Sequence, residues 1–365
     1  MGLLRFLFAL SVISAHTGPI LGASFIGGKM AVQAFFMLSG FYMAMVLAKK
    51  YNCKGSFKLF ITKRILRLYP TYWIVLIISV IVSFVFLQMG SESTLTFYKQ
   101  YQTALNPLAL GYLVLSQIFI LGMDLVMFFG VDTVHKTMFF TNDYLNTHPQ
   151  LYNFLFVPQA WTLSLEMVFY IFAPFLVKKK TRVLFFLIAV SLCFRYFLYY
   201  LGLHREPWTN RFFPTELVFF LIGILAYRLY IRIPFGKKKK VSVIFLLFLV
   251  GITLIYNSTT DGTPRSFDVL QLSYFGVLFL GIPFIFELTK RNTLDRVLGL
   301  LSYPVYISHE LVILLLQHIG QTTSKFFGIE VVVVTALVSA ILIILIENPI
   351  NRYRQGRLDK KEFAM

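Results

Sequence analysis

Residues 69–88 read YPTYWIVLIISVIVSFVFLQ, a run of 20 residues without a charged side chain. A helix needs about 20 mostly apolar residues to cross the hydrocarbon core of a bilayer. Arg64 and Arg67 directly precede the run, and membrane proteins collect basic residues on the cytoplasmic side. The stretch therefore predicts a membrane-spanning helix that begins at the cytoplasmic face.

Nine further apolar runs extend this prediction to the whole chain. They cover residues 3–22, 29–48, 159–177, 183–202, 214–233, 241–257, 268–288, 297–319 and 329–349. Hydrophobic residues make up 58% of the 365 residues and charged residues only 14%, about half the charged share of a soluble domain. A soluble domain must expose polar residues and could not bury this much apolar surface. The sequence thus predicts an all-α integral membrane protein with ten transmembrane helices.

The distribution of basic residues predicts the orientation of these helices. The net charge is +18, which on a soluble protein would suggest a nucleic-acid partner. Here most of the basic residues fall in segments that lie on one side of the membrane if ten helices alternate, as the positive-inside rule requires. Both termini are then cytoplasmic, the bilayer is the partner, and no nucleic acid is expected.

One apolar stretch, residues 107–130, does not fit as an eleventh span. A crossing there would put the later basic clusters on the opposite side from the cluster at 49–67. We therefore expect a re-entrant or interfacial segment inside a long outer loop, 89–158. Residues 1–350 are predicted to form one membrane domain, followed by a short basic cytoplasmic tail, 351–365.

Ionisable side chains at membrane depth are costly, and each one indicates a candidate functional site. Helix rise puts His16 about 16 Å from the inner face, with Arg195 and His309 at about 18 Å. Glu166 lies at a similar depth in its own helix, about 19 Å from the inner face. We expect these four side chains to meet. The alternative is a polar network that only fixes helix packing.

The residue types indicate acyl transfer to an alcohol. A neutral imidazole beside a carboxylate is a general base suited to a hydroxyl group near neutral pH. We expect His16 to be this base, Glu166 to orient its ring, and His309 to be the rival base. A nearby arginine can bind a phosphate or stabilise an oxyanion. The chain has no CxxC, HExxH or Walker motif, so we expect neither a metal site nor a nucleoside-triphosphate site.

Six short motifs, in order along the chain, resemble those of a known family. They are R-x10-H from Arg5 to His16, FFMLSGF at 35–41, RILR at 64–67, WTLSLE at 161–166, SYPVY at 302–306 and ENP at 347–349. In this combination the sequence resembles the acyltransferase-3 family of membrane acyltransferases, many of which modify glycans. One position departs from the family pattern, because Thr162 stands where the family often has serine.

The resemblance implies a fold of ten helices and the transfer of an acyl group, commonly acetyl, to a glycan hydroxyl. It implies acetyl-CoA or another acyl-CoA as donor, held at the cytoplasmic side by Arg5, Arg64 and Arg67, and His16 as a catalytic residue. The acceptor would be an extracytoplasmic or lipid-linked saccharide, and the location the bacterial inner membrane. Substrate contacts are expected from Ser39, Trp161, Tyr170, Arg195 and Tyr306.

Two other classes of function remain open from the sequence. Charges near the midplane also mark transport pathways, so a transporter or flippase of an anionic solute or lipid-linked sugar is an alternative. A structural subunit of an envelope complex is another. Single motifs also have plainer explanations: Ser39 and Gly40 would permit close helix packing, RILR could be an ordinary positive-inside cluster, and Trp161 could be an interfacial belt residue.

Overall fold

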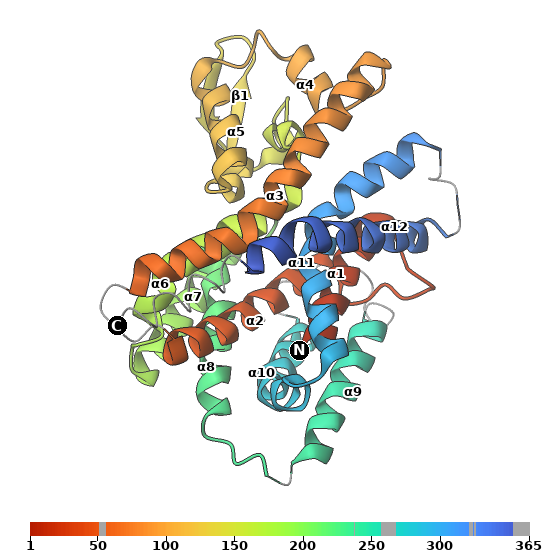
Figure 1. Cartoon of the computed structure of the whole chain (residues 1–365). Coiled ribbons are helices and arrows are strands. Elements are labelled where there is room, and N and C mark those ends of the chain that lie inside the picture. Colours follow the sequence, from red (N-terminus) through yellow and green to blue (C-terminus); the bar gives the residue numbers. More distant parts are fainter. Residues whose placement is uncertain (51–55, 237, 257–267, 321–323, 325, 353–365) are drawn as a thin grey trace.

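Figure 1 presents the chain as a computed structural model, which describes residues 1–50, 56–236, 238–256, 268–320, 324 and 326–352. Most of the described chain is helical, and each of the ten predicted apolar runs contains a helix. These are α1 (Gly2–Thr17), α2 (Gly27–Lys50), α3 (Ser56–Gln88), α6 (Trp161–Leu176), α7 (Thr181–Tyr200), α8 (Phe213–Tyr230), α9 (Lys239–Ile255), α10 (Val269–Thr289), α11 (Thr293–His318) and α12 (Phe327–Leu342), with a π-helical turn at Ile343–Glu347.

Eight of these helices are long and apolar enough to cross a membrane. The other two are α1, with 16 residues, and α9, with 17. The helical class of the fold is confirmed. The count of ten spans and the cytoplasmic termini stay predictions, and residues 353–365 of the expected tail lie outside the described part of the chain.

Two helix boundaries differ from the sequence prediction. The first helix ends at Thr17 instead of residue 22, because Gly18 adopts a left-handed φ of 86° and Pro19 follows it. The third helix begins at Ser56 instead of residue 69. Hydropathy marks only the apolar part of a helix, while Lys and Arg are good helix formers. Arg64 and Arg67 therefore lie within α3 and not in the loop before it.

The outer loop, 89–158, contains more structure than the all-α prediction allows. It holds α4 (Thr94–Gln100), α5 (Pro107–Phe119), four 3₁₀ turns (Met123–Phe128, Tyr144–Asn146, Leu151–Phe154 and Pro158–Ala160) and an antiparallel hairpin of β1 (Phe129–Asp132) and β2 (Thr137–Phe140). The hairpin corrects the purely helical expectation. Strands of four residues are too short to leave a clear alternating pattern in the sequence.

The apolar stretch 107–130 does not form a spanning helix. Its helix, α5, has 13 residues and is about 20 Å long, and side chains of α3 hold its C-terminal end. The Tyr72 hydroxyl donates to the Gln117 carbonyl at 2.5 Å, and the Trp73 indole donates to the Ile118 carbonyl at 2.9 Å. These bonds satisfy carbonyls that the end of a helix leaves without partners.

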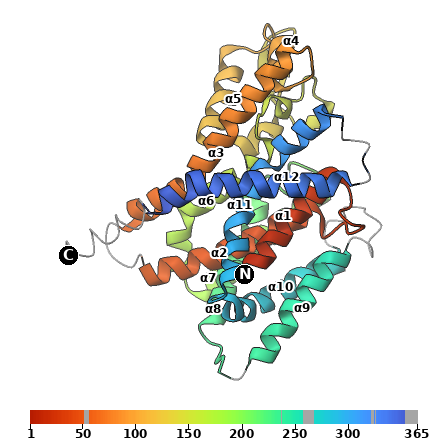
Figure 2. The same cartoon turned by 45° about the vertical axis from the view of Figure 1, so that its right-hand side comes forward.

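Three helices pack closely around α1, which carries Arg5 and His16. This helix lies against α2, α11 and α12 (Figures 1 and 2), and Leu4, Phe8 and Ile13 on it are fully buried. Helices α2 and α8 approach each other through glycines. A Cβ atom added at Gly40 would lie 2.1 Å from the Phe220 carbonyl oxygen. Small residues allow such close backbone approach between membrane helices.

Candidate active site

Two histidines and one carboxylate meet between α1 and α11. The Nδ1 atom of His16, near the end of α1, lies 3.0 Å from Oε1 of Glu310 on α11. The ring centroids of His16 and His309 are 5.4 Å apart. Nε2 of His309 lies 3.8 Å from the same Glu310 oxygen. The structure thus brings together the two predicted histidines with a carboxylate for which the sequence argument had no role.

The two histidines differ in their access to a substrate. The His16 side chain is 46% exposed, whereas His309 is fully buried. Nδ1 of His309 lies 2.7 Å from the Tyr306 carbonyl oxygen, which can only accept a hydrogen bond, so Nδ1 carries the proton and Nε2 the lone pair. That Nε2 atom is buried and has no hydrogen-bond partner among the described residues. His16 is therefore the better placed base for an incoming hydroxyl group.

The pair of His16 and Glu310 has the geometry of a general base and its orienting group. When Nδ1–H of His16 donates to Glu310, the Nε2 lone pair is left to accept a proton. The carboxylate then stabilises the imidazolium that forms. Two imidazoles and a carboxylate are also donors that zinc uses, and the relevant atoms lie within 4.8 Å of one another. The expectation of no metal site stays a prediction.

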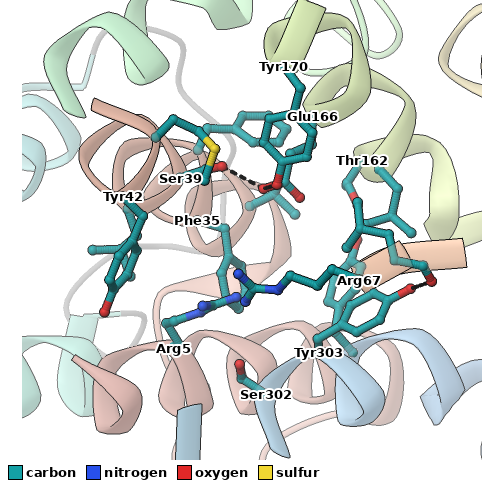
Figure 3. A pocket seen from close by; sticks show the side chains of 17 residues that line it. Arg5, Phe35, Ser39, Tyr42, Arg67, Thr162, Glu166, Tyr170, Ser302 and Tyr303 are labelled. Carbon is teal, nitrogen blue, oxygen red and sulfur yellow. Dashed lines mark hydrogen bonds between the residues drawn. The ribbon is translucent and has the colours of Figure 1, made fainter. Parts of the chain in front are cut away.

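A second group of polar side chains lines a pocket on the other side of Tyr306. Arg5 of α1 and Arg67 of α3 both line it, and their guanidinium groups point toward one another in Figure 3. Among the described residues, no carboxylate lies within 4.0 Å ion-pair distance of either arginine. Two facing cations repel each other. The pocket is therefore suited to an anionic group.

Glu166 belongs to this pocket and not to the histidine pair. Its Oε1 atom accepts hydrogen bonds from the Ser39 and Tyr170 hydroxyls, both at 2.5 Å (Figure 3). The expected role of Glu166 in orienting His16 is wrong in geometry, because the carboxylate beside that ring is Glu310. Depth along a helix sets only one coordinate, and the rotation of α6 points Glu166 toward α2.

Tyr306 joins the pocket to the histidines. Its ring lines the pocket, its hydroxyl lies 2.8 Å from the Thr162 hydroxyl, and its carbonyl oxygen is the partner of His309. The ring of Phe35, another lining residue, lies 6.0 Å from the Tyr306 ring. Tyr306 and then His309 therefore stand between the cationic pocket and the His16–Glu310 pair.

The remaining predicted residues lie elsewhere. Arg64 does not line the pocket, since its guanidinium lies over the rings of Phe60 and Tyr170, 5.4 and 5.8 Å from their centroids. Arg195 forms a 2.7 Å ion pair with Glu216, so the expected meeting of four ionisable side chains is not found. The guanidinium carbon of Arg211 lies over the Trp161 ring, 4.5 Å from the ring centroid.

The sequence comparison agrees with these features. Residues 1–347 match the family described as an acyltransferase domain. The chain belongs to the acyltransferase-3 family. A protein of Aquifex aeolicus (strain VF5), described as an uncharacterized protein, is 24% identical over 207 residues, which cover 54% of this chain and 89% of that protein. No solved structure matches.

Membership of the acyltransferase-3 family confirms the resemblance drawn from the motifs. With its apolar helices, it indicates an integral membrane acyltransferase. Sequence reasoning missed Glu310 as the partner of His16. The available signal was its place in the chain, since Glu310 directly follows His309 and is the only Asp, Glu, Lys or Arg between Arg296 and His318.

Proposed function

We propose that this acyltransferase moves an acyl group, in the first instance acetyl, from cytoplasmic acyl-CoA to a hydroxyl of an extracytoplasmic or lipid-linked glycan. His16 takes the proton of the hydroxyl, and the oxygen attacks the thioester carbonyl. The C–S bond then breaks, the CoA thiolate leaves, and the proton passes from His16 to the thiolate. The products are an O-acyl ester and CoA, and the step requires no other reactant.

The observation that carries this proposal is the pairing of two sites along one helix. Arg5 and His16 both lie on α1, eleven residues and therefore about 16 Å apart. Arginine binds phosphate through two parallel hydrogen bonds, and CoA is rich in phosphate. A donor whose phosphates lie between Arg5 and Arg67 can extend its thioester past Tyr306 toward His16. The cationic end is the cytoplasmic end in the predicted topology, as a donor from the cytoplasm requires.

Exposure of His16 supports an acceptor that arrives from the other side. Glu310, its partner, is also partly exposed, with 25% of its side chain accessible. A polar acceptor such as a saccharide can reach these atoms without crossing the apolar core. A location in the bacterial inner membrane would supply acyl-CoA on one side and envelope glycans on the other.

The test is acyl transfer by the purified protein in lipid nanodiscs. Radiolabelled acetyl-CoA is added together with a glycolipid and polysaccharide extract of the source cells, and the labelled products are identified by mass spectrometry. We expect an acetyl ester on a saccharide hydroxyl, with release of one CoA per ester. The His16→Asn variant is the control and should give almost no product. If the folded wild-type protein gives no labelled saccharide, the proposal is wrong.

A further inference from the structure

A groove separate from the donor pocket lies between α7 and α10, with α8 at its floor. Its apolar lining follows one face of each helix: Phe185, Ile188 and Leu192 on α7, Val218, Phe219, Ile222 and Leu225 on α8, and Leu272, Phe275, Gly276 and Phe279 on α10. From Phe185 to Arg195 the groove extends about 15 Å along α7. Phe185, Leu192 and Leu272 are exposed at its edges, so the groove opens toward the membrane.

One end of the groove is cationic. Lys29 of α2 and Arg195 of α7 both line it there. Glu216 pairs with Arg195 at 2.7 Å, and nearby Glu206 pairs with Arg211 at 2.9 Å. Each of these carboxylates is therefore neutralised by its own arginine. The positive charge of Lys29 therefore remains without a carboxylate partner among these described groups.

Lys29 has capacity to bind a ligand. Its Nζ atom donates one hydrogen bond, to the Thr209 hydroxyl at 3.1 Å, although an ammonium group has three donors. In the part of the chain that the structure describes, no carboxylate lies within 4.0 Å of it. The buried Nε atom of Arg195 also has no hydrogen-bond partner among the described residues. Two cationic groups at one end of the groove thus offer donors that no described acceptor satisfies.

The cationic end lies at the same end of the molecule as His16. Lys29 is in the first turn of α2, and the hydrogen bond from Gln33 in the second turn to Glu216 at 3.2 Å places this part of α2 beside the first turn of α8. A Cβ atom added at Gly28, next to Lys29, would lie 3.3 Å from the Cβ of Ala15, next to His16. The cationic end and the candidate catalytic pair are therefore neighbours.

We propose that this groove binds a phosphate-bearing lipid, with its phosphate at Lys29 and Arg195 and its hydrocarbon chain along α7, α8 and α10. An apolar groove open to a bilayer is filled by lipid chains, and phosphate is the anionic group to which such chains are joined in anionic lipids. A free phosphate ion would leave the apolar part unexplained, and a partner helix would leave Lys29 without an anion. The proposal goes beyond acyl transfer, because binding requires no reaction.

The test is lipid binding measured by native mass spectrometry of the purified chain in detergent. The probes are dioleoyl phosphatidylglycerol, dioleoylglycerol as the same lipid without phosphate, and glycerol phosphate as the head group without chains. We expect phosphatidylglycerol to bind at least roughly tenfold more tightly than either, since hydrogen bonds to charged groups contribute on this scale. Equal binding of the two lipids, or equal binding of glycerol phosphate, would overturn the proposal.

Two variants with matched controls locate the site. Gly276→Leu fills the groove, because no heavy atom of a described residue beyond its own helix and neighbours lies within 4 Å of the position of its Cβ. Gly251→Leu adds the same side chain at an equally open position on α9 outside the groove. Lys29→Gln removes the charge, and Lys239→Gln removes one at the exposed start of α9. We expect Gly276→Leu to weaken binding of both lipids about tenfold, and Lys29→Gln only that of phosphatidylglycerol.

These results separate the lipid site from the proposed reaction. If the two groove variants bind lipid as tightly as their controls, the site is wrong whatever the transferase activity. If phosphatidylglycerol binds as expected while the wild-type protein transfers no acetyl group, the lipid site stands and the proposed reaction fails. The protein could instead show no preference between the two lipids and bind another membrane protein, with Gly276→Leu abolishing that binding. The occupant of the groove would then be a partner helix and not a lipid.

Discussion

Nδ1 of His16 lies 3.0 Å from Oε1 of Glu310, and this contact joins the end of α1 to the middle of α11. The two residues are almost 300 positions apart in the sequence. The contact fixes which nitrogen of His16 carries the proton and which one can receive the proton of a substrate. It is the central geometric feature of the candidate active site.

Removing the charge of Glu310 should slow transfer more than any other carboxylate substitution. Glu310→Gln keeps the size of the side chain but no longer stabilises the imidazolium, and a loss of about 10²–10⁴-fold in kcat is expected. The measurement is acetyl transfer at saturating donor. Glu287→Gln is the control, because Glu287 pairs with Lys290 at 2.7 Å near the end of α10, where Thr289 contacts Met1 at the opposite end of α1 from His16. An unchanged kcat in Glu310→Gln would remove this residue from the mechanism.

The same substitution at the two histidines should give opposite results. An asparagine amide can replace the Nδ1–H donor of histidine but has no counterpart of Nε2. His16→Asn should therefore lose about 10²–10⁴-fold of the rate, the usual contribution of a general base. His309→Asn can keep the bond to the Tyr306 carbonyl and should retain most of the activity. A dead His309→Asn with an active His16→Asn would move the base to α11.

The donor pocket predicts different effects for two arginines of one motif. Arg67 lines the pocket and Arg64 does not. Arg67→Lys should raise KM for acetyl-CoA roughly tenfold, because lysine lacks the forked phosphate contact of arginine. Arg64→Lys should change KM little, so it serves as the matched control. An unchanged KM in Arg67→Lys would remove Arg67 from donor binding, and an equal rise in both variants would extend the donor site to Arg64.

The close contact of α2 and α8 predicts strong sensitivity to added methyl groups. A Cβ atom at Gly40 or Gly223 would lie 2.1 or 2.0 Å from a backbone carbonyl oxygen of the other helix, and backbone cannot move aside as a side chain can. Gly40→Ala and Gly223→Ala should each destabilise the fold by about 3 kcal/mol or more. Thermal unfolding in detergent measures this loss. Gly251→Ala, at an open position, should unfold like the wild type.

The predicted orientation can be tested by cysteine labelling in intact cells. Cys53 and Cys193 are first replaced by serine. Asn146→Cys, exposed in the outer loop, should then react with a thiol reagent that cannot cross the membrane. Lys239→Cys, exposed at the start of α9, should react only after the cells are opened. The reverse pattern would contradict cytoplasmic termini.

The helices of this protein could be predicted from the sequence because length and hydropathy are local properties. The run at 69–88 predicted α3, although the structure begins that helix at Ser56, since a basic helical segment carries no hydropathy signal. The charges on either side of 107–130 argued against a span there, and the structure gives this stretch a helix of only 13 residues. The β-hairpin in the outer loop could not, because its strands have only four residues each.

The sequence by itself determined the apolar helices, the family through its ordered motifs, and the positions of His16 and His309 along their helices. Only the tertiary structure decided which side chains meet. It placed Glu310 instead of Glu166 beside His16, brought Arg5 and Arg67 into one pocket, and paired Arg195 with Glu216. The physical reason is that sequence position gives the height of a side chain along its helix, whereas its partners depend on the rotation and packing of neighbouring helices.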